Sequence, residues 1–466
     1  MSVTGVSAMI ENEIDNCSAG SMYTLVFMVH FATTAAVVLW LTRQQSLPKI
    51  LLGKSVWGGC VLALGVLVFA LVVFRASHPR ILSWDFWVGY YPAGQAALHN
   101  DLSALQELIG AGISGNASMP IVTYLFAPFA LLPLNLAFAI FTAIGLAFTV
   151  ATWFLLVRLA GLEHRERWLL AILFFANGPL LDGIKLGNLS YMVLFPLAAG
   201  LAMLRAGRSA PAGALLAAAA MIKPALLLFG VFFALRGDVR GVFGFACVCA
   251  ITAALSLLLF GWDYNWYWFE NVILRYSNNW VAAFSNQSVP AFLYRLHAPP
   301  QILLDWVAHA PSRFERVVAW IITGLLYLTA AAAWIKSSTR AATEQYAQAV
   351  DRQDLQYLLT ICLCLVASPL TWIHYYAWLL IPTAFFLGSR PAFPPSRVAR
   401  SVGWLAIFAV TPLVINPAVQ WPWQGSNAVL SQAYSSFAVS NLFFGGLLWF
   451  GLVAWWLAAP IGVRRV

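Results

Sequence analysis

Long apolar runs follow one another along most of this chain, and they constrain its fold more than any other feature. A helix rises 1.5 Å per residue, so about 20 apolar residues are needed to cross the roughly 30 Å hydrocarbon layer of a membrane. Only 9% of the 466 residues are charged, against about a quarter in soluble domains, so the chain is expected to be a multispanning membrane protein. We place its spans at residues 22–41, 55–74, 134–157, 168–185, 188–204, 241–260, 316–335, 355–370, 373–388, 401–417 and 438–459.

Two further apolar segments do not fit a single crossing. Residues 211–235 have Lys223-Pro224 at their middle and arginines beyond both ends, which indicates a broken hairpin. Residues 120–133 are too short to span and predict an interfacial or re-entrant helix. The expected fold is therefore an all-α polytopic bundle of about 11–13 spans. No loop is long enough for a separate soluble domain, so residues 1–466 form one integral membrane domain.

The positive charges predict the orientation of the chain, because cytoplasmic loops are enriched in Lys and Arg. One set of alternate loops, together with the C-terminal arginines, holds 18 of the 26 Lys and Arg residues. This places the N-terminus outside and the C-terminus in the cytoplasm, with outer loops at 75–120 and 261–315. The net charge of +9 thus reflects topology, since no basic cluster with interleaved aromatics suggests nucleic-acid binding. The cytoplasmic set comprises loops 42–54, 158–167, 205–210, 236–240, 336–354 and 389–400 with Arg464 and Arg465.

Asp85 is the strongest candidate for a catalytic residue, because it stands among aromatic residues just after a predicted span. An isolated acid here is either a solvated loop residue, a helix cap or a base. Aromatic rings stack on sugar faces, and their low local dielectric makes a carboxylate a better base. The aromatic neighbours are Trp84, Phe86, Trp87, Tyr90 and Tyr91.

Two other segments carry groups suited to an anionic ligand. Lys223 lies at membrane depth, where an unpaired ammonium costs roughly 2.5 kcal/mol or more, so it needs a partner. That partner is either a lipid phosphate or a carbonyl freed by Pro224. In the corner Ser368–Tyr376, His374 could donate to a phosphate oxygen or protonate a leaving group; the alternative is a satisfied interfacial histidine.

Several motifs are absent from the sequence. It has no Asp-x-Asp pair, no His/Cys ligand cluster and no Gly-rich loop for a nucleotide, and five of its six cysteines lie in apolar spans. No metal ion or other cofactor is implied, and a nucleotide-sugar donor is not expected.

Residues 80–390 resemble glycosyltransferase family 87, whose polytopic GT-C-type members use polyprenol-phosphate sugars and include alpha-mannosyltransferases. The resemblance rests on Trp84-Asp85-Phe86, Lys223-Pro224, Asn286-Gln287-Ser288 with Arg295, and Ser368-Pro369…Trp372…His374. The chain departs from the family where Lys185-Leu186-Gly187-Asn188 replaces the usual Gly-Gln-x-Asn, and where Thr123-Tyr124 stands in place of Tyr-Pro-Pro.

The resemblance implies a hexosyltransferase of the inner (plasma) membrane with its active site on the outer side. It would move a hexose, with mannose favoured, from a polyprenyl monophosphate to a lipid or glycan acceptor with inversion. Asp85 would be the general base, and the donor phosphate would be bound by Lys223, Arg295 and His374. The residues expected to contact the sugar or acceptor are Trp84, Tyr90, Tyr91, Asn188, Asn286, Gln287 and Trp372.

Two other functions are compatible with a membrane protein of this kind. A transporter or flippase for a lipid-linked glycan would bind substrate at Lys223 without chemistry. It would have no need of Asp85, and it would often show inverted repeats, which are not visible in the sequence. A glycan polymerase or ligase using a pyrophosphate carrier would be expected to have more paired outer arginines.

Overall fold

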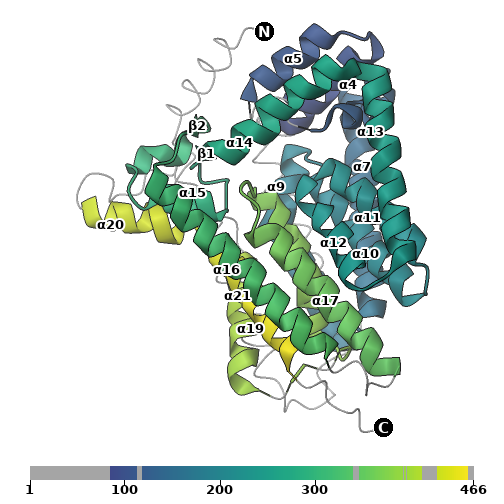
Figure 1. The fold of residues 1–466 in the computed structure, drawn as a ribbon, viewed down its shortest axis with the longest axis vertical. Helices are drawn as coiled ribbons and strands as arrows, with labels where there is room; N and C mark the ends of the chain where they lie inside the picture. Colours follow the sequence, from purple (N-terminus) through teal and green to yellow (C-terminus); the bar gives the residue numbers. More distant parts are fainter. Residues whose placement is uncertain are drawn as a thin grey trace, which may run out of the picture.

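The structure is a computed structural model, and it describes residues 84–112, 118–339, 346–391, 393–394, 396–411 and 428–459. Its first part folds into short helices followed by a series of longer ones (Figure 1). The short elements are η2 (Asp85–Tyr90), α4 (Tyr91–Leu98), α5 (Leu102–Gly110), η4 (Pro120–Leu125) and α6 (Ala127–Ala130). The series that follows comprises α7 (Leu134–Leu159), α8 (His164–Ala176), α9 (Gly178–Leu186), α10 (Ser190–Arg205), α11 (Ser209–Ile222), η5 (Pro224–Leu227), α12 (Leu228–Leu235) and α13 (Val239–Trp268).

The second part begins with short elements and returns to long helices. The short elements are η6 (Phe269–Leu274), α14 (Arg275–Asn278), β1 (Trp280–Val281), α15 (Val289–Arg295), η7 (Pro300–Leu304) and β2 (Ala308–His309). β1 and β2 pair antiparallel, with Trp280 opposite His309. The remaining elements are α16 (Arg313–Ser338), α17 (Tyr346–Val366), η9 (Ile373–Leu379), α18 (Leu380–Leu387), α19 (Arg397–Val410), α20 (Ala428–Ala433), η10 (Tyr434–Ala438) and α21 (Asn441–Ala458).

The helical fold confirms the predicted all-α polytopic class. Among the described residues, four helical stretches are long and apolar enough to cross a membrane, and α8 with α9 makes a fifth if this pair, bent by 47°, is one span. The other predicted spans in the described residues fall on shorter or more polar helices. Predicted spans 22–41 and 55–74 lie outside the described residues, as does the end of 401–417. The four stretches are Leu134–Leu159, Val239–Asn278, Arg313–Ser338 and Asn441–Ala458.

Burial separates the inner helices from those at the surface. In α21, 61% of the apolar window is buried inside the protein, compared with 17% in α13 and in α16. The exposed apolar side chains of α13 and α16 include Leu258 and Trp320, and on helices long enough to cross a membrane such faces are suited to contact with lipid. The chain is therefore a multi-pass membrane protein, with α21 inside the bundle and α13 and α16 at its surface.

The predicted hairpin of residues 211–235 is broken at Lys223. α11 ends at Ile222, Lys223 is extended with φ −133° and ψ 95°, and η5 begins at Pro224. Proline cannot donate a backbone hydrogen bond and disfavours helical geometry in the residue before it, so the break follows from the sequence. Residues 120–133 form the short elements η4 and α6.

The position of Lys223 depends on the close packing of α11 against α13. A Cβ atom on Gly213 would collide with the Gly241 carbonyl oxygen, and one on Gly244 would collide with the carbonyl of Ala210. Small residues at such positions let two helix backbones approach closely in a membrane. This contact fixes the axis of α11, at whose end Lys223 lies.

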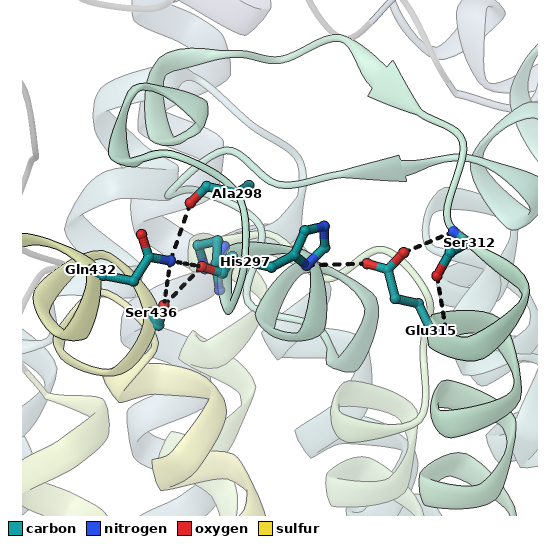
Figure 2. Close-up of polar contacts among 7 residues, drawn as sticks. His297, Ala298, Ser312, Glu315, Gln432 and Ser436 are labelled. Carbon is teal, nitrogen blue, oxygen red and sulfur yellow. Dashed lines mark hydrogen bonds and ion pairs between the residues drawn. The ribbon is translucent and has the colours of Figure 1, made fainter. Parts of the chain in front are cut away.

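The predicted loop 261–315 contains more helix than expected. Gly261 adopts φ 74° and ψ 174°, but the helix resumes after this break and continues to Trp268. The rest of the segment is held by polar contacts (Figure 2): Gln432 donates to the carbonyls of Arg295 and Ala298, and His297 Nδ1 lies 3.5 Å from Glu315 Oε1 at the start of α16. The segment is thus tied to α20 on one side and to α16 on the other.

Candidate functional site

Asp85 is the first residue of η2, and the aromatic residues after it hold this turn in place. Phe86 is fully buried, with its ring centroid 4.9 Å from that of Phe141. Tyr90 stacks on Phe126 at 4.5 Å, and the Tyr91 hydroxyl donates to the Leu132 carbonyl at 2.8 Å. Three of the aromatics of the Asp85 segment therefore anchor its backbone, while Trp84 is partly exposed beside Asp85.

The side chain of Asn188 connects Asp85 to the rest of the site. Asn188 Nδ2 donates to Asp85 Oδ2 at 2.5 Å, while Asn188 Oδ1 accepts from the Ser190 amide at 2.9 Å and from Lys223 Nζ at 3.4 Å. Gly187, in the left-handed conformation with φ 64°, ends α9 and lets the chain turn there into α10. The side chain of Asn188 thus contacts the Asp85 carboxylate through its nitrogen and the Lys223 ammonium group through its oxygen.

Lys223 reaches this site from the broken hairpin. Its side chain is buried, and Nζ lies 4.7 Å from the centre of the Tyr375 ring. Besides this cation–π contact, Lys223 Nζ has one hydrogen-bond acceptor among the described residues, the Asn188 side-chain oxygen. An ammonium group has three donors, so Lys223 keeps capacity for an anionic ligand.

His374 lies on η9, next to Tyr375. Its Nδ1 is 3.6 Å from Asp182 Oδ2, and its Nε2 is buried without a hydrogen-bond partner among the described residues. A buried nitrogen without a partner carries a desolvation cost of about 1–3 kcal/mol that a ligand oxygen would remove. The geometry therefore leaves one imidazole nitrogen free to bind a ligand.

The charges around Asp85 oppose one another. Burial raises the pKa of the Asp85 carboxyl, whereas His374, the Asn188 hydrogen bond and Lys223 lower it. Burial is the largest of these effects, so the pKa lies above its ordinary value. Asp182 adds a smaller upward contribution to the same pKa. A carboxyl with a raised pKa is a stronger base when ionised, which suits proton abstraction from a hydroxyl.

Four residues predicted to bind substrate have other partners in the structure. Asn286 Nδ2 donates to the Val281 carbonyl and Asn286 Oδ1 accepts from the Thr371 amide. Gln287 Nε2 donates to the carbonyls of Phe284 and Val439, and Gln287 is fully buried. Trp372 forms a β-bridge with Asn286 and is partly buried. The amides of Asn286 and Gln287 hold the corner before η9 in place, and none of the hydrogen bonds described for them involves Asp85 or Lys223.

Arg295 is the fourth of these residues, and both of its terminal nitrogens have protein acceptors, whereas its buried Nε has no hydrogen-bond partner among the described residues. Its side chain is fully buried, and Nη1 donates to the carbonyls of Ala282, Ala283 and Asn286 at 2.9–3.1 Å. Nη2 donates to Ser440 Oγ at 3.0 Å. Because these bonds occupy both terminal nitrogens of the guanidinium, Arg295 lies in the core of segment 280–295, and none of its described hydrogen bonds involves Asp85, Lys223 or His374.

Three residues of the site were not singled out from the sequence. Asp182 contacts His374, Ser190 Oγ donates to Asn188 Oδ1 at 2.5 Å, and Tyr375 covers Lys223. Asp182 is the single acid of the predicted span 168–185, and this was its one signal in the sequence. Among the described residues, no group of His, Cys, Asp and Glu side chains could hold a metal ion.

Comparison with known proteins places this geometry in context. The model of "Glycosyltransferase family 87" matches residues 119–369, which include Asn188 and Lys223, while Asp85 and His374 lie outside the match. A relative from Mycolicibacterium smegmatis (strain ATCC 700084 / mc(2)155) is 26% identical over 318 residues, covering 64% of this chain and 68% of the relative. That protein is named a polyprenol-phosphate-mannose-dependent alpha-(1-2)-phosphatidylinositol mannoside mannosyltransferase. No solved structure matches the chain.

Proposed function

Since this chain belongs to glycosyltransferase family 87, we propose that it transfers a hexose, with mannose favoured, from a polyprenyl monophosphate to an acceptor hydroxyl. The Mycolicibacterium relative, named a polyprenol-phosphate-mannose-dependent mannosyltransferase, supports this choice of donor. The acceptor is a lipid or glycan on the outer side of the plasma membrane. In this proposal the N-terminus is outside, the C-terminus is cytoplasmic, and segment 84–112 is in the outer part of the protein.

Asp85 acts as the general base. The acceptor oxygen attacks the anomeric carbon and gives its proton to Asp85 Oδ1 or Oδ2. The bond between the anomeric carbon and the phosphate oxygen breaks, and its electron pair stays on the phosphate. A single displacement of this kind inverts the anomeric configuration and needs one base on the face opposite the leaving group.

Lys223 and His374 stabilise the departing phosphate. The Lys223 ammonium, with donors left over after its bond to Asn188, neutralises phosphate charge at membrane depth. His374 Nε2 supplies a second contact to a phosphate oxygen. Cationic groups fixed before the reaction begins are usually a large contribution to this kind of catalysis.

One observation carries the proposal: Asn188 holds Asp85 and Lys223 in one site. These residues are 103 and 35 positions from Asn188 in the sequence. A base and a phosphate-binding cation on either side of one amide correspond to the attacking hydroxyl and the leaving phosphate, which lie on opposite sides of the anomeric carbon. A transporter would need the cation but would gain nothing from the base.

The experiment is label transfer by the purified protein in detergent. It would be incubated with radiolabelled polyprenyl-phosphate-mannose, polyprenyl-phosphate-glucose or GDP-mannose, together with phosphatidylinositol mannoside or membrane-extracted glycolipid acceptors. The proposal expects a new labelled glycolipid from the mannosyl lipid and none from GDP-mannose. Transfer from GDP-mannose would refute the donor. Movement of intact labelled lipid across proteoliposomes without a new product would instead support a flippase.

A further inference from the structure

Among the residues proposed to carry the reaction, Asp182 has its described ion-pair contact with His374, and its charge makes the smallest of the described contributions to the pKa of Asp85. Its Oδ2 is 3.6 Å from His374 Nδ1, and the opposite ring nitrogen, Nε2, is buried and unpartnered among the described residues. We propose that Asp182 is a positioning residue, whose carboxylate holds the imidazole so that Nδ1–H faces α9 and Nε2 faces the phosphate of the polyprenyl donor. This inference rests on the proposed function.

The backbone around Asp182 brings its carboxylate close to His374 Nδ1. The Asn177 side chain caps the start of α9 by accepting from the Leu180 amide at 2.9 Å. The next residue after Asp182 is Gly183, where a Cβ would lie 3.4 Å from the Cβ of His374 and 3.3 Å from that of Tyr191. Without a side chain at Gly183, α9 and η9 pack directly against each other, which brings the two side chains into contact.

The chemistry of imidazole explains why a carboxylate at Nδ1 matters at Nε2. An imidazole has two distinct nitrogens, and the hydrogen bond made by one decides the protonation of the other. A carboxylate beside Nδ1 keeps a proton there, so Nε2 is the ring nitrogen that faces the ligand. When Nε2 also carries a proton, Nε2–H donates to a phosphate oxygen, since the sugar-phosphate diester has no proton of its own to give near neutral pH.

A purely structural role is the alternative, in which Asp182 only fastens η9 to α9. The two roles differ in what happens when His374 is already absent. A positioning residue then has nothing left to position, so its removal changes nothing more. A structural residue would lower activity in the double variant as well.

The experiment measures donor use and phosphate binding in parallel. Asp182→Ala, Asp182→Asn, His374→Ala and the double variant Asp182→Ala/His374→Ala would be assayed for donor kcat/KM and for farnesyl phosphate affinity by titration calorimetry. Asp305→Asn is the matched control, because Asp305 also pairs with a histidine, His309, at 2.9 Å. Detergent melting temperatures would be recorded for every variant.

Asp182→Ala should lower kcat/KM and farnesyl phosphate affinity by about 10- to 100-fold, as loss of positioning at a charged contact does. Asp182→Asn, which keeps an acceptor for Nδ1–H, should recover part of this loss, and the double variant should match His374→Ala within about twofold. Asp305→Asn should behave like the parent.

An additive double variant, or unchanged farnesyl phosphate affinity in Asp182→Ala, would overturn the inference. Weak farnesyl phosphate binding by the parent itself would overturn it as well. The proposed function fails separately: a parent that binds the phosphate in an Asp182-dependent way but transfers no sugar keeps this inference and loses the transferase. A parent that transfers sugar equally well without the Asp182 carboxylate keeps the proposed function and refutes this inference.

Discussion

Asn188→Ala is the substitution that best separates the two roles open to this residue. The sequence predicts that Asn188 contacts the sugar or acceptor, whereas its hydrogen bonds in the structure make it a holder of the base. Its Nδ2 donates to Asp85 Oδ2 at 2.5 Å, and its Oδ1 accepts from Lys223 Nζ at 3.4 Å. Alanine removes both contacts without adding a new group.

The expected magnitude follows from the charge on the acceptor. A hydrogen bond to a charged group contributes about 1.5–3 kcal/mol, against about 0.5–1.5 kcal/mol for a neutral pair. At about 1.4 kcal/mol per factor of ten, loss of the Asp85 contact predicts a kcat/KM about 10- to 100-fold lower. Asp85 is partly exposed, so water will replace some of the lost bond, and the lower end of this range is expected.

The dependence of kcat/KM on pH should change in a defined direction when Asn188 is replaced. The Asn188 hydrogen bond lowers the pKa of Asp85, so removing it raises that pKa further. The base must be ionised to act, and kcat/KM therefore falls as pH decreases through this pKa. In Asn188→Ala the acid limb of the profile should move to higher pH, and the loss of activity should grow as the pH is lowered.

The assay is kcat/KM for the mannosyl donor between pH 5 and 9, with detergent melting temperatures as the check on folding. Asn279→Ala is the matched control, because the Asn279 side chain donates to a backbone carbonyl, that of Arg275, at 3.1 Å. An unmoved acid limb, with a loss confined to KM of about tenfold or less, would show that Asn188 binds sugar and would refute its role beside Asp85.

Three further predictions concern the cations and the orientation. Lys223→Met should raise the donor KM at least tenfold while Lys223→Arg keeps part of the activity, and a Met variant with the parent's kinetics would make this lysine structural. Arg295→Met should lower the melting temperature in detergent, because the buried carbonyls of Ala282 and Asn286 lose this donor at about 1–3 kcal/mol each, while the Ala283 carbonyl still accepts from the Asn286 amide. A stable variant with only a raised donor KM would restore its phosphate role. Ser103, Ser277 and Ser338 are exposed. Cysteines introduced at Ser103 and Ser277 should react with an impermeant maleimide in intact cells, while one at Ser338 should not. The opposite pattern would put Asp85 in the cytoplasm.

The fold was largely predictable from the sequence because apolar length determines a membrane helix. The run predicted at 134–157 is α7, Leu134–Leu159, and the run predicted at 316–335 is α16, Arg313–Ser338. The break at Lys223 was predictable too, since Pro224 acts on the residue directly before it. The prediction that a loop begins at Gly261 was wrong. The residues after it are polar and aromatic, yet they form helix because they pack against α5 and η4.

The site was less predictable, because contacts between distant segments decide which polar side chains remain free. Asn286, Gln287 and Arg295 have the side-chain chemistry of sugar or phosphate ligands, but they donate to backbone carbonyls, those of Val281 and Asn286 within the same segment and that of Val439 from a distant one. Asp182 stood alone as an acid in its predicted span, and the contact with His374, 192 positions along the chain, is what identifies it. Local sequence shows what a side chain can do, and packing decides whether it is available.

Asp85→Asn is the measurement that tests the central claim most directly. Asparagine keeps the size of the side chain but cannot accept the proton, so turnover of the mannosyl donor should fall by about 10² or more. Farnesyl phosphate affinity and melting temperature should stay close to those of the parent and of the control Asp263→Asn, whose side chain is exposed. An Asp85→Asn protein that is as stable as the parent and still transfers sugar at a similar rate would contradict the assignment of Asp85 as the base.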